Sequence, residues 1–294
     1  MRVLVTGAQG QLGKDVVCIF SDSEHEVLGY GKNELDITNF DQCQEMINEK
    51  KPDCIIHCAA YTAVDAAETD MDQAYRINAV GTRNLALAAE SSDSKLIYIS
   101  TDYVFNGRGE IPYVEYDQTD PQSVYGKSKL AGEFLTQTLC SKWFVVRTSW
   151  AFGLNGNNFV KTMMRLGQEK PVLRVVNDQK GSPTYTTDLA LFLMELAATE
   201  KYGIYHASNQ GECTWFEFTQ AIFEETHEVL GLTMRAELSP CTTSDFPRPA
   251  LRPANSVLDH MSIRTNGFTD LPHWRDALKR FMLDIKDDPE LYLN

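Results

Sequence analysis

A tyrosine and a lysine lie four residues apart in the run Ser123-Val124-Tyr125-Gly126-Lys127-Ser128-Lys129. On a helix, this spacing places the phenol of Tyr125 and the ammonium of Lys129 on one face, one turn apart. A free phenol exchanges protons poorly at neutral pH, because its pKa is about 10. A cation one turn away favours the phenolate and lowers that pKa. The pair therefore indicates a proton donor, although an ordinary amphipathic helix with a surface tyrosine and lysine has the same spacing.

Three glycines, Gly7, Gly10 and Gly13, follow an apolar run and precede a helical one. Glycine permits a tight turn and lets backbone N–H groups approach a pyrophosphate, which a helix N-terminus also attracts. The spacing Gly-x-x-Gly-x-x-Gly differs from the Gly-x-Gly-x-x-Gly fingerprint of dinucleotide-binding proteins, but its place after the first strand is the same. We therefore expect a dinucleotide cofactor; the alternative is a glycine-rich turn without a ligand.

Strands and helices alternate through the first half of the chain. Apolar runs predict the strands, and helical periodicity predicts the helices between them. The expected strands are 2–6, 25–30, 53–58, 95–100 and 143–147, and the expected helices are 14–20, 40–50, 72–91 and the one that carries Tyr125. This alternation is typical of an α/β fold with a Rossmann-like doubly wound parallel sheet. Ligands of such sheets bind beyond the carboxyl ends of the strands, so the loops there should hold the site.

Beyond residue 150 the alternation weakens. Further strands are expected at 172–176 and 204–207, and further helices at 158–168, 188–199, 215–228 and 274–286. Residues 1–150 are therefore predicted to form an NAD(P)-binding Rossmann domain, to which segments near 172–206 return. Residues 151–294 are predicted to form mainly a smaller, C-terminal substrate-binding lobe.

The composition limits the class of partner. The 294 residues carry a net charge of −14, which argues against a nucleic acid or an anionic membrane but not against a small anionic ligand. No signal segment precedes the first strand, and no apolar run reaches the roughly eighteen residues of a membrane span, so we expect a cytoplasmic protein. Seven scattered cysteines and six histidines without metal-ligand spacing favour free thiols and no catalytic metal.

The end of the second strand often decides between NAD and NADP, because an acid there binds the ribose 2′-hydroxyl. Here the sequence is Gly29-Tyr30-Gly31-Lys32, without a carboxylate. Lys32 is expected to meet a 2′-phosphate, so NADPH is the predicted cofactor and NADH the weaker alternative. Asp36 and Ile37 follow within reach of the adenine.

These motifs resemble those of the extended short-chain dehydrogenase/reductases, which carry a similar glycine turn and Tyr-x-x-x-Lys pair. Five further runs are similar to the dTDP-4-dehydrorhamnose reductase branch of that family. They lie at 58–65, 100–105, 147–150, 156–163 and 178–184. The resemblance covers nearly the whole chain, in order.

The resemblance implies a role for each matching residue. Tyr125 is the proton donor to the sugar 4-keto oxygen, Lys129 binds the nicotinamide ribose and lowers the pKa of Tyr125, and Thr101 hydrogen-bonds at the reacting oxygen. The cofactor is expected to contact Gly7, Gly10, Gln11, Leu12, Gly13, Tyr30, Lys32, Asp36, Ile37, Ala59, Ala60, Tyr61, Thr62, Ile99, Tyr125 and Lys129. The substrate is expected to contact Thr101, Asp102, Trp150, Asn158, Arg248 and Arg252.

The residues themselves leave alternatives for several of these roles. Thr101 ends the fourth strand, where a hydroxyl can share an oxygen with a phenol of the next helix, but alone it would be an ordinary turn residue. Trp150 offers a flat apolar face to a deoxysugar, or is a core aromatic. Asn158 at a helix start and the two arginines beside prolines are candidate diphosphate ligands; surface ion pairs are the alternative for the arginines.

The residue at position 103 favours reduction over elimination of water. Related sugar-nucleotide dehydratases carry a glutamate after the Thr-Asp pair, because elimination of water needs an acid and a base at adjacent carbons. In this chain Tyr103 follows Thr101 and Asp102. Reduction needs only one hydride and one proton, which the cofactor and Tyr125 supply.

The sequence therefore predicts an oxidoreductase that uses NADPH to reduce the 4-keto group of dTDP-4-dehydro-6-deoxy-L-mannose to dTDP-L-rhamnose. The alternatives are another sugar-nucleotide reductase or epimerase on the same fold, and a non-catalytic NADP-binding regulatory subunit. The chain is expected to be a monomer or a homodimer. Some relatives are dimers bridged by Mg²⁺ through glutamates, but Asp15 stands at the matching position, which puts that contact in doubt.

Overall fold

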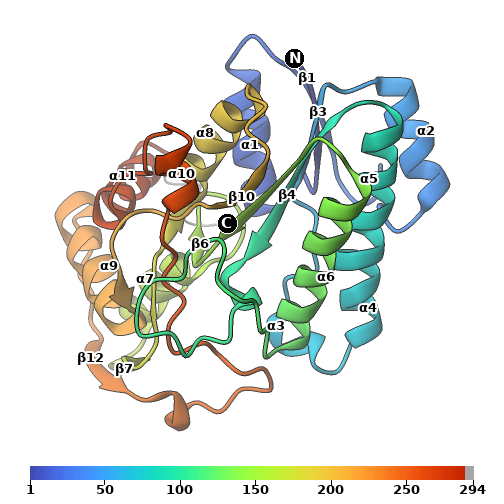
Figure 1. Cartoon of the computed structure of the whole chain (residues 1–294). Coiled ribbons are helices and arrows are strands. Elements are labelled where there is room, and N and C mark those ends of the chain that lie inside the picture. Colours follow the sequence, from blue (N-terminus) through green and yellow to red (C-terminus); the bar gives the residue numbers. More distant parts are fainter. Residues whose placement is uncertain (289–294) are drawn as a thin grey trace.

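A six-stranded parallel sheet forms the centre of the computed structural model, which describes residues 1–288 (Figure 1). The strands lie side by side in the order β10-β5-β4-β3-β1-β2. They are β1 (Arg2–Thr6), β2 (Glu26–Tyr30), β3 (Cys54–His57), β4 (Lys95–Thr101), β5 (Trp143–Thr148) and β10 (Gly203–His206). Since β2 and β3 lie on opposite sides of β1, the switch point of this Rossmann-type sheet lies beside the carboxyl end of β1.

The inner strands are apolar because both of their faces are covered. All four residues of β3 are buried, as is typical of a central strand in a parallel sheet. The register pairs His57 with Tyr98, and β4 continues from there to Thr101. The end of β4 therefore extends beyond the end of β3, which lifts Thr101 towards the carboxyl edge of the sheet.

Helices cover both faces of the sheet, as the prediction of a doubly wound fold requires. One face packs against α1 (Gln11–Ser21), α8 (Thr186–Ala197) and α10 (Met261–Thr265), with Val5, Ile56 and Phe268 in the shared core. The other face packs against α2 (Phe40–Lys50), α5 (Thr82–Ser91) and α6 (Val124–Leu139), with Leu4 and Ile55 in a second core. Figure 1 shows the two helical layers on either side of the strands.

One predicted helix is not uniform. In place of a single helix over 72–91, the chain forms α4 (Met71–Tyr75), a π-helical segment η1 (Arg76–Gly81) and then α5. Asn78 is buried within the π-helical segment. Such segments are rare and often occur at functional sites, and a period of 3.6 residues does not distinguish them from an α-helix.

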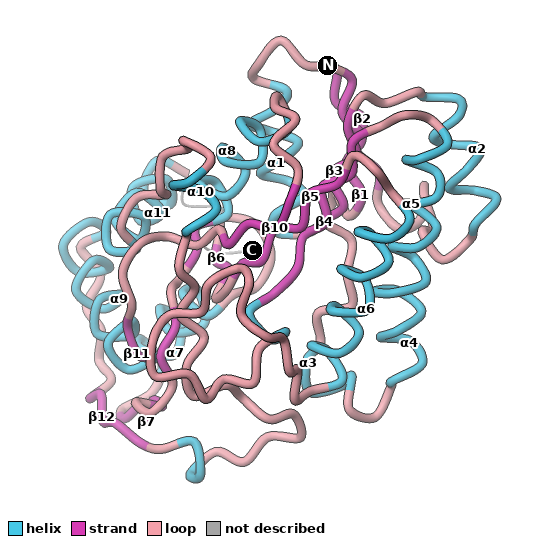
Figure 2. Tube along the Cα trace, in the orientation of Figure 1, coloured by secondary structure: helices cyan, strands magenta, loops and turns pink. Residues whose placement is uncertain are grey.

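A separate hydrophobic cluster lies among the helices of the C-terminal half. Figure 2 shows where these helices lie. The cluster joins α7 (Phe159–Glu169), α9 (Trp215–Leu230) and α11 (Trp274–Asp287) around Phe152, Phe218 and Phe281. Short strands pair beside it: β6 (Ala151–Phe152) with β9 (Thr184–Tyr185), β7 (Val172–Val176) with β12 (Glu237–Cys241), and β8 (Lys180–Gly181) with β11 (Cys213–Thr214). The remaining short helices are α3 (Val64–Ala67), η2 (Asp102–Val104) and η3 (Thr243–Asp245).

The segments predicted to return to the first domain go to different places. Strand β10 joins the six-stranded sheet next to β5, and α8 covers that sheet. Strand β7 instead pairs with β12, so it lies outside the central sheet. The two-part division of the chain near residue 150 stays a prediction.

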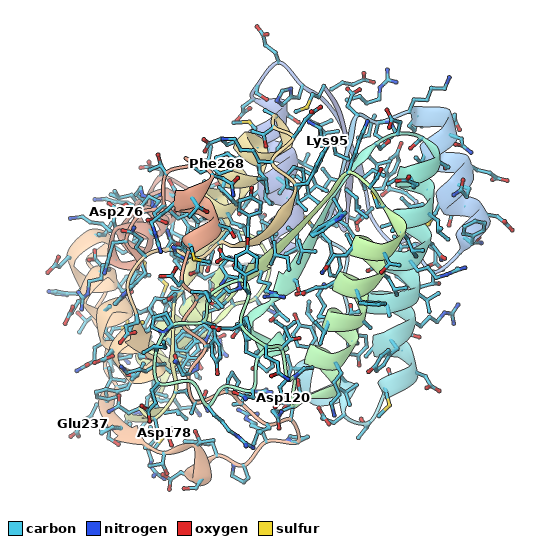
Figure 3. The ribbon with its side chains drawn as sticks, viewed as in Figure 1. Lys95, Asp120, Asp178, Glu237, Phe268 and Asp276 are labelled. Atoms are coloured by element: carbon cyan, nitrogen blue, oxygen red, sulfur yellow. The ribbon has the colours of Figure 1, made fainter. Side chains whose placement is uncertain are left out.

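The acidic character of the chain is visible at its surface. Figure 3 shows Asp120, Asp178, Glu237 and Asp276, which come from four different parts of the chain and are all exposed. Within residues 1–288, no helix combines the length and the apolar character that crossing a bilayer requires.

Candidate active site

A cavity of about 850 Å³ runs along the carboxyl ends of the central strands. Its lining follows the order of the strands, from the loop after β2, past the glycine turn after β1 and the loop after β3, to the ends of β4 and β5 and the start of α6. Seventeen of the predicted site residues line it: Gly7, Gly10, Gln11, Leu12, Gly13, Lys32, Asp36, Ile37, Ala59, Ala60, Thr62, Ile99, Thr101, Asp102, Tyr125, Lys129 and Trp150. Tyr30, Tyr61, Asn158, Arg248 and Arg252 are the predicted site residues that do not line it.

Helix α6 brings Tyr125 and Lys129 to the end of β4. Its N-cap is Ser123, whose side chain accepts a hydrogen bond from Gly126 N at 3.1 Å, so the helix begins directly before Tyr125. The Tyr125 hydroxyl has a side-chain hydrogen bond with Thr101. Lys129 is buried, and its Nζ donates to the carbonyl of Ile99 at 2.6 Å. The three residues that the sequence predicted as catalytic therefore lie together.

Burial controls the protonation of this group. It raises the pKa of Tyr125 to about 12, against the hydrogen bond with Thr101, which lowers it. Burial also lowers the pKa of Lys129 to about 7. For the phenol of Tyr125, desolvation therefore outweighs the hydrogen bond that lowers its pKa. The predicted effect of Lys129 on this pKa stays a prediction.

Asp102 is a second buried acid at this end of the cavity. Its Oδ1 accepts a hydrogen bond from Thr101 Oγ1 at 2.9 Å. Its Oδ2 is buried and has no partner of hydrogen-bond length and angle among the described residues, although the Ser256 hydroxyl is near enough to lower the pKa of this carboxyl. Burial raises the pKa of Asp102 to about 6. Buried polar atoms are normally paired, so Oδ2 marks a place where a ligand can donate a hydrogen bond.

The glycine turn has the geometry that a pyrophosphate needs. Gly7 adopts φ +66°, and a Cβ there would lie 2.7 Å from Ala59 N. A Cβ on Gly13 would overlap the carbonyl of Gly7. Gly10 is the N-cap of α1, so the N-terminal N–H groups of that helix face the cavity edge.

Asn78 holds the loop that follows β3. Its amide exchanges two hydrogen bonds with the backbone of Tyr61, at 2.8 and 3.1 Å, and donates to Ser128 of α6 at 2.9 Å. The π-helical segment is thus where the buried amide reaches both the loop and the catalytic helix. Tyr61 is fixed by its backbone, which positions its neighbours Ala60 and Thr62 in the wall of the cavity.

The end of the cavity beside β2 carries two cations. Lys32 and Arg76 both line it, and both act on Asp36. Burial would raise the pKa of Asp36, but hydrogen bonds from Thr38 and these two charges hold it below its usual value. Arg76 was not predicted, because its position in the sequence has no motif; the turn of the π-helical segment places it here.

The other end of the cavity is bounded by Trp150. Its indole stacks on that of Trp215, with ring centroids 3.4 Å apart and planes inclined by 6°. Trp150 has φ +47°, a backbone conformation that residues with a side chain rarely adopt. One face of Trp150 is therefore covered by Trp215, and Gly181 lies so close to the indole that a Cβ there would overlap it. The part of Trp150 that lines the cavity stays accessible to a ligand.

Two of the remaining predicted ligands, Asn158 and Arg252, have side chains that bond to other parts of the chain. Asn158 caps α7, accepting from Lys161 N at 3.1 Å and donating to Gly153 O at 2.7 Å; its neighbour Asn157 lines the cavity. Arg252 forms an ion pair with Asp65 of α3 at 2.8 Å. Arg248 is exposed, and the backbone of Tyr30 hydrogen-bonds to Ala8 at 3.1 Å. Contacts of these residues with a ligand stay predictions.

Several cavity residues were not predicted as ligands; they are Gln9, Leu35, Thr38, Val64, Gln73, Arg76, Ile77, Ser100, Thr148, Ser149, Ala151 and Leu189. Gln9, Val64, Ser100, Thr148 and Ser149 lie within the recognised runs, and Ala151 directly follows Trp150. Extension of the predicted site to every residue of these runs would therefore have found part of this set.

The described residues contain no cluster of His, Cys, Asp and Glu side chains that fits a metal ion. Asp15, which stands where some relatives carry a bridging glutamate, is buried and bonded within the chain. It accepts a hydrogen bond from Asn155 at 3.0 Å and a short one from Thr186 at the start of α8. Its carboxylate thus joins α1 to α8.

Comparison with known proteins gives matches over nearly the whole chain. The family model described as "RmlD substrate binding domain" matches residues 1–286. A dTDP-4-dehydrorhamnose reductase of Aggregatibacter actinomycetemcomitans is 44% identical, with 95% of this chain and 97% of that protein covered. The spore coat polysaccharide biosynthesis protein SpsK of Bacillus subtilis is 41% identical, with 96% of each covered.

One solved structure also matches this chain over nearly its whole length. The crystal structure of a dTDP-4-dehydrorhamnose reductase of Bacillus anthracis in complex with NADP superposes with a TM-score of 0.93 at 46% identity. The superposition covers 96% of this chain and 99% of that one.

Proposed function

Because the chain belongs to the RmlD substrate binding domain family, whose matched relatives include dTDP-4-dehydrorhamnose reductases, we propose that it reduces dTDP-4-dehydrorhamnose to dTDP-L-rhamnose with NADPH. The chain is an NADPH-dependent oxidoreductase with a Rossmann-type fold. The observation that carries the finer proposal is the meeting of Thr101, Tyr125 and Lys129 in the same cavity as the glycine turn.

The residues of the cavity fit this cofactor. The glycine turn and the N-terminus of α1 would hold the pyrophosphate, and Lys32 would pair with the 2′-phosphate. Lys129, fixed to the Ile99 carbonyl, would hold the nicotinamide ribose. When bound, NADPH supplies the hydride.

Tyr125 holds the proton that the reduction consumes. With a pKa of about 12, its phenol stays protonated at neutral pH and is present as a donor before each turnover. An alkoxide is a stronger base than a phenolate, so proton transfer from the Tyr125 hydroxyl to the reduced carbonyl oxygen is favourable. Thr101, hydrogen-bonded to Tyr125, would orient the same oxygen.

The sugar would lie between Asp102 and Trp150. The unpaired Oδ2 of Asp102 can accept a hydrogen bond from a sugar hydroxyl, which would remove the cost of leaving it buried and alone. Trp150 offers an apolar surface to the deoxy face of the ring. Tyr103 packs edge-on against Tyr125, with ring centroids 5.5 Å apart, and burial keeps it a neutral phenol. It does not replace the glutamate that elimination of water would need.

The remaining predictions follow from this assignment. The cluster around α7, α9 and α11 would bind the nucleotide part of the substrate, and the cytoplasm, where sugar nucleotides are made, is the proposed location. A role in polysaccharide biosynthesis fits the relative from Bacillus subtilis. The chain acts as a monomer or a homodimer in this proposal.

A panel of keto sugars tests the proposal. The chain is incubated with NADPH and 4-keto-6-deoxy sugars attached to dTDP, UDP and GDP, with a 3,5-epimerase to supply the L-sugar, and absorbance of the nicotinamide is followed. We expect consumption of NADPH with the dTDP-L-sugar. Consumption only with another nucleotide identifies a different reductase, tightly bound cofactor without net consumption indicates an epimerase, and no turnover of any sugar leaves the regulatory alternative.

A further inference from the structure

A buried carboxylate lies on the same face of α6 as the proton donor. Glu133 follows Lys129 by four residues and Tyr125 by eight, a spacing that aligns the three side chains along the helix. Glu133 is only 1% exposed, although carboxylates rarely lie in a protein interior without a partner. The proposed chemistry does not use it directly.

Glu133 joins the three elements that form the reacting end of the cavity. Its Oε1 accepts hydrogen bonds from Ser100 Oγ of β4 at 2.5 Å and from Arg147 Nε of β5 at 2.9 Å, and its Oε2 accepts from Arg147 Nη2 at 2.7 Å. Ser100 pairs with Arg147 across the two strands and directly precedes Thr101. One carboxylate thus fixes α6, which carries Tyr125, against the strand end that carries Thr101.

The same carboxylate acts on Lys129. Burial lowers the pKa of Lys129, and Glu133 and Cys58 oppose this. Cys58 stays a neutral thiol, since burial raises its pKa to about 12, so Glu133 supplies the negative charge. The other groups that face the ammonium are neutral: the ring of Tyr98 at 4.1 Å and His57, whose pKa burial lowers to about 3.

We propose that Glu133 is a positioning residue for the reduction. It fixes how closely α6 packs against β4 and β5, and it keeps Lys129 charged for cofactor binding. This inference rests on the proposed function. Arg147 balances the charge of Glu133 without contacting the cavity, and it is held in turn by the carbonyl of Glu115 at 3.2 Å.

Two variants separate the charge of Glu133 from its contribution to folding. Glu133→Gln keeps the shape and the acceptor for Ser100 but leaves Arg147 buried without its anion, which lowers stability. The double variant with Arg147→Met removes both charges and restores part of that stability. Asp188→Asn is the matched control, because Asp188 is another buried carboxylate, paired with Arg280 at 2.7 Å, in a different helix.

The pH dependence of kcat/KM for NADPH, measured with saturating sugar nucleotide, is the readout. In the wild type this value should fall as the pH rises through the pKa of Lys129, near 7. Both Glu133 variants should move this loss about one pH unit lower. Above both pKa values the protonated fraction of Lys129, and with it kcat/KM for NADPH, is then about tenfold lower than in the wild type, while the KM for the sugar nucleotide stays unchanged.

The outcomes distinguish the possible roles. If Glu133 only stabilises the fold, the double variant, once its melting temperature recovers, will show the wild-type pH profile, and the inference is overturned. An equal shift in Asp188→Asn would overturn it as well, since the effect would then belong to any lost buried charge. A wild type that turns over none of the keto sugars disproves the proposed function instead, before the variants are compared.

Discussion

At the scale of single residues, two acids at the end of β4 have pKa values raised by burial, and each has a separate consequence. The phenol of Tyr125 stays protonated at neutral pH, as a proton donor must before it reacts. The carboxyl of Asp102, with a pKa of about 6, is ionised at neutral pH at a cost to the folded state. Groups that a protein keeps at such a cost are commonly found at functional sites.

We predict that Asp102→Asn changes how stability depends on pH. The folded pKa of Asp102 is about 6 and its ordinary value is 3.8, so between these values the unfolded chain binds fewer protons. Stability of the wild type relative to the variant therefore falls by about 2.4 kcal/mol as the pH rises from 4 to 7, and is nearly constant above that. Urea unfolding of both proteins at several pH values measures this difference. A difference that is independent of pH would contradict the assigned pKa.

A second prediction concerns Lys32. Replacement by Ala removes the cation proposed for the 2′-phosphate, so the KM for NADPH should rise about tenfold, equivalent to about 1.4 kcal/mol, while the KM for NADH stays the same. Steady-state kinetics with both cofactors measure it. Lys279→Ala, which removes an exposed ammonium of α11, is the control. A strong preference for NADH that Lys32→Ala leaves unchanged would show that Lys32 does not select the cofactor.

The site residues that could be predicted from the sequence are those that lie in local motifs. Gly7, Tyr125 and Lys129 lie in runs whose spacing has a physical reason, and the cavity contains all three. The side chain of Asn158 is instead a helix cap, and that of Arg252 is in an ion pair. The cap could be predicted, since Asn158 stands at an expected helix start and its partner Lys161 is three residues away. The ion pair could not, because Asp65 lies far along the chain. Arg76 reaches the cavity for the same reason, through packing that no local pattern records.

At the scale of elements, the glycine turn and the first helix act as one unit. The approach of Gly13 to the carbonyl of Gly7 closes the turn, and that of Gly7 to Ala59 joins it to the loop after β3. The N-terminus of α1 is thereby held at the edge of the cavity.

We therefore predict that Gly13→Ala weakens NADPH binding more than tenfold and lowers the free energy of unfolding by about 2 kcal/mol, because the added methyl group forces the turn open. Fluorescence titration with NADPH and urea unfolding measure the two effects. Gly10→Ala is the comparison, since its Cβ would meet only the Gly7 carbonyl, at 3.2 Å. Wild-type affinity in Gly13→Ala would mean that the turn does not hold the cofactor.

The long periodic elements could be predicted, and the short ones could not. The strands β1 and β4 and the helices α2 and α6 follow apolar runs or helical periodicity that no neighbour disturbs. Strands of two residues, such as β6 and β9, are too short to show alternation, and the π-helical segment is hidden within a helical pattern. The pairing of β7 with β12 joins residues more than sixty apart, which a single sequence does not reveal.

At the scale of the whole molecule, the proline-rich segment 246–253 ties the C-terminal half to the sheet. It leaves η3 and crosses towards α3 (Figure 1). There Arg252 pairs with Asp65, and Pro253 packs against Gly107. The charge of Arg252 also acts on Tyr103, which lines the cavity. The segment therefore lies near Tyr103, the neighbour of Tyr125, on one side of the site.

We predict that Asp65→Asn raises the KM for the sugar nucleotide several-fold and leaves the KM for NADPH unchanged. The ion pair is partly exposed, so its loss should reduce stability by only about 0.5–1 kcal/mol. Steady-state kinetics and thermal unfolding provide the two measurements. Arg165→Gln, which breaks the exposed Arg165–Glu169 pair of α7, should change neither KM. Equal changes in both KM values for Asp65→Asn would indicate general loosening of the fold instead of an effect on the sugar end.

The most direct test of the central assignment compares the wild type with Tyr125→Phe, using dTDP-4-dehydrorhamnose and NADPH. We predict that the wild type consumes NADPH as dTDP-L-rhamnose forms. The variant should bind NADPH with unchanged affinity but turn over at least about a hundredfold more slowly, because the phenol that donates the proton is gone. If Tyr125→Phe keeps most of the wild-type kcat, Tyr125 is not the proton donor and the mechanism proposed for this site is wrong.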